Sequence, residues 1–112
     1  MKRYKMVVLS DPTQGQEEQY NRWYQDVHLP ELLGLEGLKF AKRFRRARTL
    51  GERETYSYMA VYEIETDDID AVMGNLVHTA QCDQLTLSCA IDTAHSHAVV
   101  YGQIGFEVFE PQ

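Results

Sequence analysis

The sequence has few cysteines, fewer basic than acidic side chains and no long apolar run. Its only two cysteines, Cys82 and Cys89, are too few for a disulfide framework. The net charge of −6 repels phosphate backbones, so we expect no nucleic-acid partner. No apolar run approaches the roughly 20 residues that cross a bilayer. The basic first residues are not followed by the long apolar stretch that a signal peptide requires. We therefore expect a cytoplasmic protein without a membrane partner.

What is present is the composition of a folded globular chain. The 112 residues are 44% hydrophobic and 25% charged, which suits a single domain, 1–112, with one core. In a reducing compartment we expect both cysteines to be small core residues. The alternative is a metal site built from Cys82, Cys89, His95 and His97. Their spacing fits no closed zinc pattern, so we expect no metal.

The hydrophobic pattern predicts an α+β order, β-α-β-β-α-β. Strands are expected at 4–10, 38–46, 55–65 and about 96–108, with an irregular connection at 81–94. One helix is expected at 16–28, ending or kinking at Pro30, and another follows a cap at Thr66. This order is typical of a ferredoxin-like fold, in which two helices cover one face of a four-stranded antiparallel sheet. The strand residues are apolar on both faces, so we also expect a homodimer with its sheets packed face to face.

His28 is the main candidate for chemistry. It continues the apolar face of the first helix, eight residues after Tyr20 and four after Tyr24. It also lies at the expected C-terminal end of that helix, where backbone carbonyls favour the protonated imidazole. Such a histidine can act as a general acid or base. The alternative is a core histidine that is hydrogen-bonded to a backbone carbonyl.

Aromatic residues form the second candidate feature. The first helix is expected to turn its aromatic stripe toward the sheet that carries Tyr56, Tyr58 and Tyr62. These rings form either an aromatic core or a cleft for a flat apolar ligand, and both can hold in one fold. The candidate ligand-binding residues are Tyr20, Trp23, Tyr58, Tyr62 and Asp92.

A run of basic residues interrupts the otherwise acidic chain between Lys42 and Arg48. It is either a solvated sheet edge or, at Arg43, a cation that points into the cleft. In the second case Arg43 would bind a carboxylate or an enolate oxygen.

The stretch from Tyr20 to Leu33, YNRWYQDVHLPELL, resembles the EthD-type branch of the dimeric α/β-barrel superfamily. Its N-x-W-Y-x-x-x-H-L-P pattern carries most of the likeness, and residues 37–44 and 59–64 are similar in style to the second and third strands of that family. The resemblance implies a ferredoxin-like monomer that pairs into an eight-stranded barrel. Relatives include cofactor-free cyclases, lactone isomerases, dehydratases and monooxygenases, and a histidine of the motif matches His28.

Together these features predict a small cofactor-independent lyase or isomerase that acts on a hydrophobic aromatic or alicyclic carbonyl compound. His28 would move a proton beside the carbonyl, and Tyr24, Tyr58 or Arg43 would hold the developing oxyanion. The alternatives are a non-catalytic small-molecule-binding protein of a degradation pathway and a cofactor-free monooxygenase with Trp23 beside its substrate. We expect neither a cofactor nor a metal.

Overall fold

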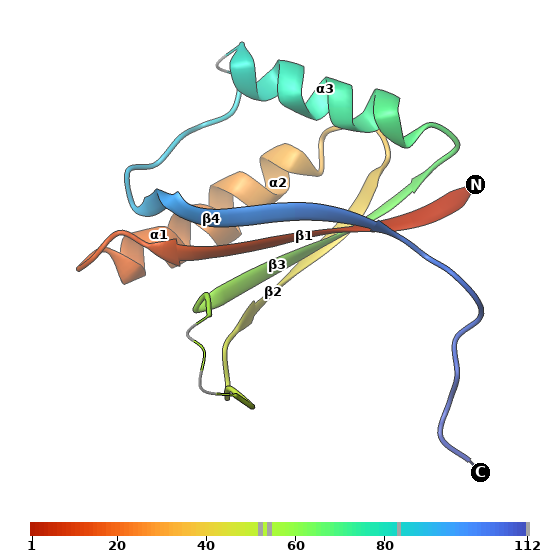
Figure 1. Ribbon diagram of the computed structural model, residues 1–112. Helices are drawn as coiled ribbons and strands as arrows, with labels where there is room; N and C mark the ends of the chain where they lie inside the picture. The colour runs from red at the N-terminus through yellow and green to blue at the C-terminus, as the bar shows by residue number, and fades with distance from the viewer. Residues whose placement is uncertain (52, 54, 83, 112) are drawn as a thin grey trace.

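The computed structural model describes residues 1–51, 53, 55–82 and 84–111 and has the expected order of elements. Its antiparallel sheet has the strand order β2-β3-β1-β4. The strands are β1 (Lys2–Pro12), β2 (Leu38–Arg45), β3 (Tyr58–Thr66) and β4 (Ile91–Gly102). All helices lie on one face of this sheet, and the other face carries none of them (Figure 1). The predicted ferredoxin-like α+β fold is therefore confirmed.

The first helical segment continues through Pro30, where we expected it to end or kink. It consists of α1 (Glu17–Trp23), the π-helical turn η1 (Tyr24–His28) and α2 (Leu29–Leu32). Leu29, before the proline, has helical angles of φ −60° and ψ −48°, and its N–H donates to the carbonyl of Tyr24. The wider π turn relieves the clash between a proline ring and the carbonyl one turn earlier. The helix therefore passes the proline and ends at Leu32.

A bulge in β2 corrects the predicted faces of that strand. Leu38 pairs with Ile64 and Phe40 with Glu63, so one residue of β2 is extra between these pairs. Leu38 is consequently buried under the helices, whereas Phe40 and Phe44 are exposed on the other face. The alternation of the sequence predicts Leu38, Phe40 and Phe44 on one face, and this is wrong because a simple alternation cannot reveal a bulge.

The second half of the chain departs from the prediction at its element ends. The helix α3 (Ile69–Gln81) is capped by Asp68, whose side chain accepts the N–H of Ala71, and not by Thr66. Strand β4 begins at Ile91 and ends at Gly102, where we expected 96–108. Residues 103–111 lie outside the sheet, and their apolar side chains, such as Phe106 and Val108, are almost wholly exposed. Of the connection predicted at 81–94, Asp83 lies outside the described residues.

The apolar residues separate into a helix-covered core and an uncovered outer sheet face. The core contains Met6, Leu38, Ala60, Ile64 and Val72, together with tyrosine rings. The strand residues that alternate with these core residues point to the outer face. They include the half-buried side chains of Val7, Leu9, Met59, Val61 and Val99. The expectation of two apolar sheet faces is thus confirmed.

The two cysteines are not core residues. Cys82 and Cys89 are exposed free thiols, because both lie at or beyond the end of α3, where nothing packs over the chain. In the described part of the chain, none of the helices has the length and apolarity required to cross a bilayer.

Candidate functional site

The tyrosine rings of the first helix and of β3 meet beneath the helix. Tyr20 and Tyr62 are 0% exposed and Tyr24 is 2% exposed. The Tyr20 ring lies 5.4 Å from that of Tyr24 and 5.0 Å from that of Tyr58. Of the two features expected of the aromatic set, the structure shows an aromatic core, since these rings are buried and contact one another. Tyr56 is not part of it, because it precedes β3 and stacks on His95.

Arg43 enters this core from the edge strand β2. It pairs across the sheet with Ala60, whose small side chain leaves room between Tyr58 and Tyr62. The guanidinium carbon lies 4.6 Å from the ring centroid of Tyr24 and 5.4 Å from those of Tyr20 and Tyr58. The alternative in which Arg43 points inward is the one observed, while Lys42, Arg45, Arg46 and Arg48 are exposed.

The guanidinium of Arg43 has a neutral partner. Its Nη2 donates to Oδ1 of Asn21 at 2.7 Å, and Nδ2 of Asn21 donates to the hydroxyl of Tyr58 at 3.1 Å. Within the described residues no carboxylate lies within 4 Å of Arg43. A half-buried cation held by an amide and by ring faces can still bind an anionic oxygen.

His28 lies next to this cluster. Its ring stacks on Trp23 at 4.6 Å and meets the edge of Tyr24 at 5.1 Å. Arg43 also contacts the Tyr24 ring, so the imidazole and the guanidinium share one aromatic neighbour. Nδ1 of His28 and the hydroxyl of Tyr62 are buried, and neither finds a hydrogen-bond partner among the described residues.

The protonation states make Arg43 the only charged group of this cluster. Burial lowers the pKa of His28 to about 4, and the carboxylate of Glu31 only partly offsets it. We had expected the helix end to favour the imidazolium, but there is no helix end at His28, and desolvation dominates. Burial also raises the pKa of Tyr24 to about 12 and those of Tyr20 and Tyr62 above their usual value. At neutral pH the cluster therefore consists of neutral donors and acceptors around one cation.

A loop from the other half of the chain is fastened over this end of the helix. Trp23 donates its ring N–H to the carbonyl of Thr86 at 2.9 Å, and Glu31 accepts from the backbone N–H and the hydroxyl of Thr86, each at 2.9 Å. Glu31 is thereby engaged with the loop, while Trp23 holds one face of His28.

Two groups lie apart from the cluster. Asp92 accepts the backbone N–H of Ala94 at 3.1 Å, so its carboxylate is used where β4 begins. The sequence reasoning missed a contact between Nε2 of His95 and Oδ2 of Asp11, 2.9 Å apart. It also assigned no role to Asn21, although Asn21 opens the N-x-W-Y motif and that position was the available signal.

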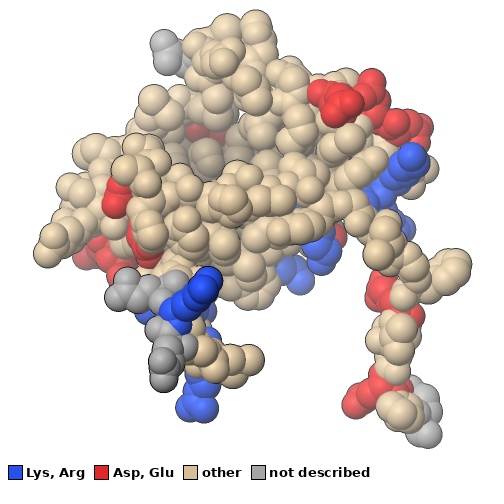
Figure 2. Space-filling model, in the orientation of Figure 1, with Lys and Arg blue, Asp and Glu red and all other residues tan. Residues whose placement is uncertain are grey.

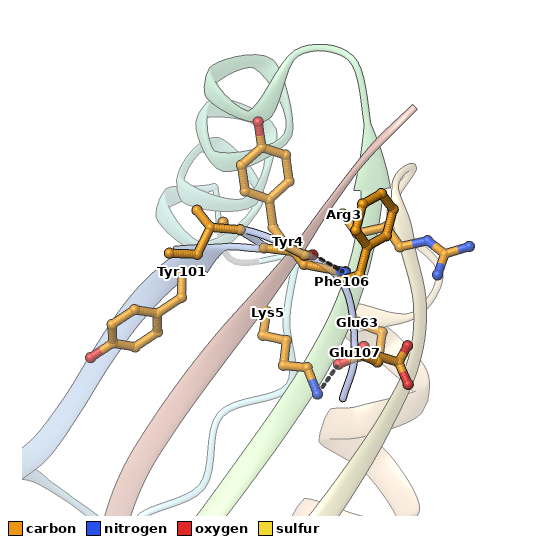
Figure 3. A pocket seen from close by; sticks show the side chains of 11 residues that line it. Arg3, Tyr4, Lys5, Glu63, Tyr101, Phe106 and Glu107 are labelled. Atoms are coloured by element: carbon orange, nitrogen blue, oxygen red, sulfur yellow. Dashed lines mark hydrogen bonds and ion pairs between the residues drawn. The ribbon is translucent and has the colours of Figure 1, made fainter. Parts of the chain in front are cut away.

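A surface hollow of about 580 Å³ lies between the outer sheet face and the exposed C-terminal segment, with Arg3, Lys5, Glu63 and Phe106 in its lining (Figure 3). Lys5 is paired with Glu63 and Arg3 with Glu65, at 3.4 Å each. These cations are therefore already neutralised, unlike Arg43.

Known structures share this fold. An EthD family protein from Bacillus halodurans superposes with a TM-score of 0.61 at 11% identity, over 91% of this chain and 99% of its own. A protein from Shewanella loihica, described as a candidate monooxygenase, gives 0.58 at 11% identity, over 94% and 97%. A dimeric ferredoxin-like protein from Jannaschia gives 0.56 at 17% identity, over 95% and 99%. No family model matches the sequence, and no curated protein does. The similarity confirms the fold that the EthD-like resemblance implied.

Proposed function

We propose that the protein is a cofactor-independent lyase or isomerase that moves a proton beside a carbonyl group. The observation that carries this proposal is the guanidinium of Arg43, held among three tyrosine rings, one of which, Tyr24, also contacts the neutral imidazole of His28. In a site with little water, such a cation stabilises negative charge that develops in the transition state.

The proposed reaction begins when an unprotonated ring nitrogen of His28 accepts the proton of a C–H bond next to the carbonyl. The bonding electrons move onto the carbonyl oxygen, and the resulting enolate accepts hydrogen bonds from Arg43 and Tyr58. In an isomerase, the C=O bond then re-forms and the imidazolium returns the proton to a carbon conjugated with the enolate. In a lyase, the C=O bond re-forms, a C=C bond forms, the bond from the neighbouring carbon to the leaving group breaks, and the leaving group takes the proton of the imidazolium. A base with a pKa of about 4 is weak. The enolate must therefore be strongly stabilised, and its charge raises the basicity of the nearby imidazole as it forms.

Hydrogen exchange tests this activity without knowledge of the natural substrate. We expect the protein in D₂O to catalyse exchange of the C–H bonds next to the carbonyl in at least one member of a panel of cyclic 1,3-diketones, lactones and β-keto acids. NMR measures this exchange against buffer alone. Binding of panel members without exchange would contradict the proposal and support the non-catalytic binding protein. Oxygen consumption would support the monooxygenase.

We further propose that two copies pair through their outer sheet faces. This face carries an uncovered apolar band, and the exposed residues 103–111 extend from the same side of the sheet (Figure 1). The Lys and Arg side chains seen in Figure 2 lie mainly along this underside, whereas the extended C-terminal segment displays Glu. A second copy would cover the apolar band, and its C-terminal segment would bring acidic residues to the basic ones.

Replacing Phe44 with glutamate should turn the dimer into a monomer, because Phe44 is 47% exposed on the outer face. The variant loses the apolar contact of the ring and must desolvate a carboxylate at an apolar interface, which together cost several kcal/mol. Light scattering after size exclusion measures the mass. The matched control is Val77→Glu, since Val77 is similarly exposed, at 52%, but lies on α3. A monomeric wild type, or an unaffected Phe44→Glu variant, would contradict this mode of pairing.

A further inference from the structure

The proposed reaction assigns no role to the Asn21 side chain, although it contacts two of the reacting groups. It stands between Arg43 and Tyr58, at 2.7 Å from the guanidinium and 3.1 Å from the hydroxyl. Asn21 lies on α1, Arg43 on β2 and Tyr58 on β3, so one amide connects three elements of the fold.

The donor and acceptor roles in this chain of contacts follow from chemistry. A guanidinium has only donors, so the amide oxygen of Asn21 must face Arg43. The amide nitrogen, which has only donors, must then face Tyr58, whose oxygen accepts. The hydroxyl hydrogen of Tyr58 is consequently not used by Asn21. Arg43 likewise keeps N–H groups that Asn21 does not occupy.

We propose that Asn21 is a positioning residue that makes Arg43 and Tyr58 a paired anion site, so that its ligand carries a carboxylate or an enolate. Asn21 holds the guanidinium without neutralising it and leaves the hydroxyl of Tyr58 as a donor. This inference rests on the proposed function for the role of the enolate, whereas the carboxylate preference requires only binding.

The location of the pair supports an external ligand. Arg43 and Asn21 are only half-buried, and β2 is an edge strand, so the site borders the rim between β2 and α1. An anionic oxygen is the kind of acceptor that the remaining N–H groups of Arg43 and the hydroxyl hydrogen of Tyr58 bind.

The substitution Asn21→Asp tests the proposal with almost no change in shape. The new carboxylate forms an ion pair with Arg43, and it also accepts the hydroxyl hydrogen of Tyr58, so both donors are consumed. We expect wild-type protein to bind benzoate at least about tenfold more tightly than benzamide, as expected for a charge-assisted contact. We expect Asn21→Asp to lose this preference while unfolding at the same temperature or higher. NMR titration with the two probes and thermal unfolding measure both effects.

Asn75→Asp is the matched control, because it adds the same charge to α3, which contributes nothing to the cluster. It should retain the preference for benzoate. Tyr58→Phe should weaken benzoate binding in part, since it removes one of the two donors. The proposal is overturned if wild-type protein does not prefer benzoate, if Asn21→Asp still prefers it, or if Asn75→Asp loses it equally. A benzoate preference without any catalysed exchange would leave this site standing and remove the proton-transfer function.

Discussion

Replacing Arg43 with methionine should lower catalysed C–H exchange by about 10²–10³-fold, the usual effect of removing one donor from an oxyanion site. Methionine fills a similar volume among the rings of Tyr20, Tyr24 and Tyr58 but cannot stabilise an enolate. Because the half-buried cation has no carboxylate partner among the described residues, its removal leaves no charge unpaired there. The folded state should therefore persist, and thermal unfolding checks this.

Two further variants separate charge from geometry at this position. Arg43→Lys keeps the charge but loses the planar fork that reaches Asn21 and a ligand together, so we expect only partial activity. Arg48→Met is the control, because Arg48 belongs to the same basic run but is exposed. Equal activity in wild type and Arg43→Met would remove the guanidinium from the mechanism.

Replacing His28 with alanine should lower the exchange rate about a hundredfold or more, as expected for the loss of a general base. The variant should still fold and form the same dimer, because His28 lies on the helix side of the sheet. Undiminished exchange in this variant would show that His28 is not the base.

The lowered pKa of His28 predicts how the activity of the protein depends on pH. With a pKa of about 4, the imidazole is unprotonated at neutral pH, so kcat/KM should be flat down to about pH 5 and fall below pH 4.

The lowered pKa of His28 also makes the stability of the folded state depend on pH. The unfolded chain, with an ordinary histidine pKa of about 6.5, binds the proton first as pH falls. The folded state should therefore lose up to about 3 kcal/mol between pH 6.5 and 4. His28→Phe lacks this group, so its stability should depend less on pH across that window.

The sequence by itself determined the fold class and most of the candidate site. The alternation in β3 and the stripe of Tyr20, Trp23 and Tyr24 predict which side chains face each other, because side-chain direction is fixed by the helical and strand periods. Those periods suffice to place His28 and the tyrosines at one interface between helix and sheet. The helical spacing singled out His28, and the motif resemblance then supported that choice.

Only the tertiary structure decided the registers, the protonation states and the role of each polar group. The bulge in β2 shifts the register of that strand against β3 by one residue. As a result, Phe40 points to the outer face and Arg43 points toward the helices. The low pKa of His28 results from its burial in the folded chain, and the loop at Thr86 holds Trp23, which stacks on its ring. The contacts of Asn21 with Arg43 and Tyr58 join three separate elements. Such long-range contacts are not encoded in any local period, so they emerge only when the chain is folded.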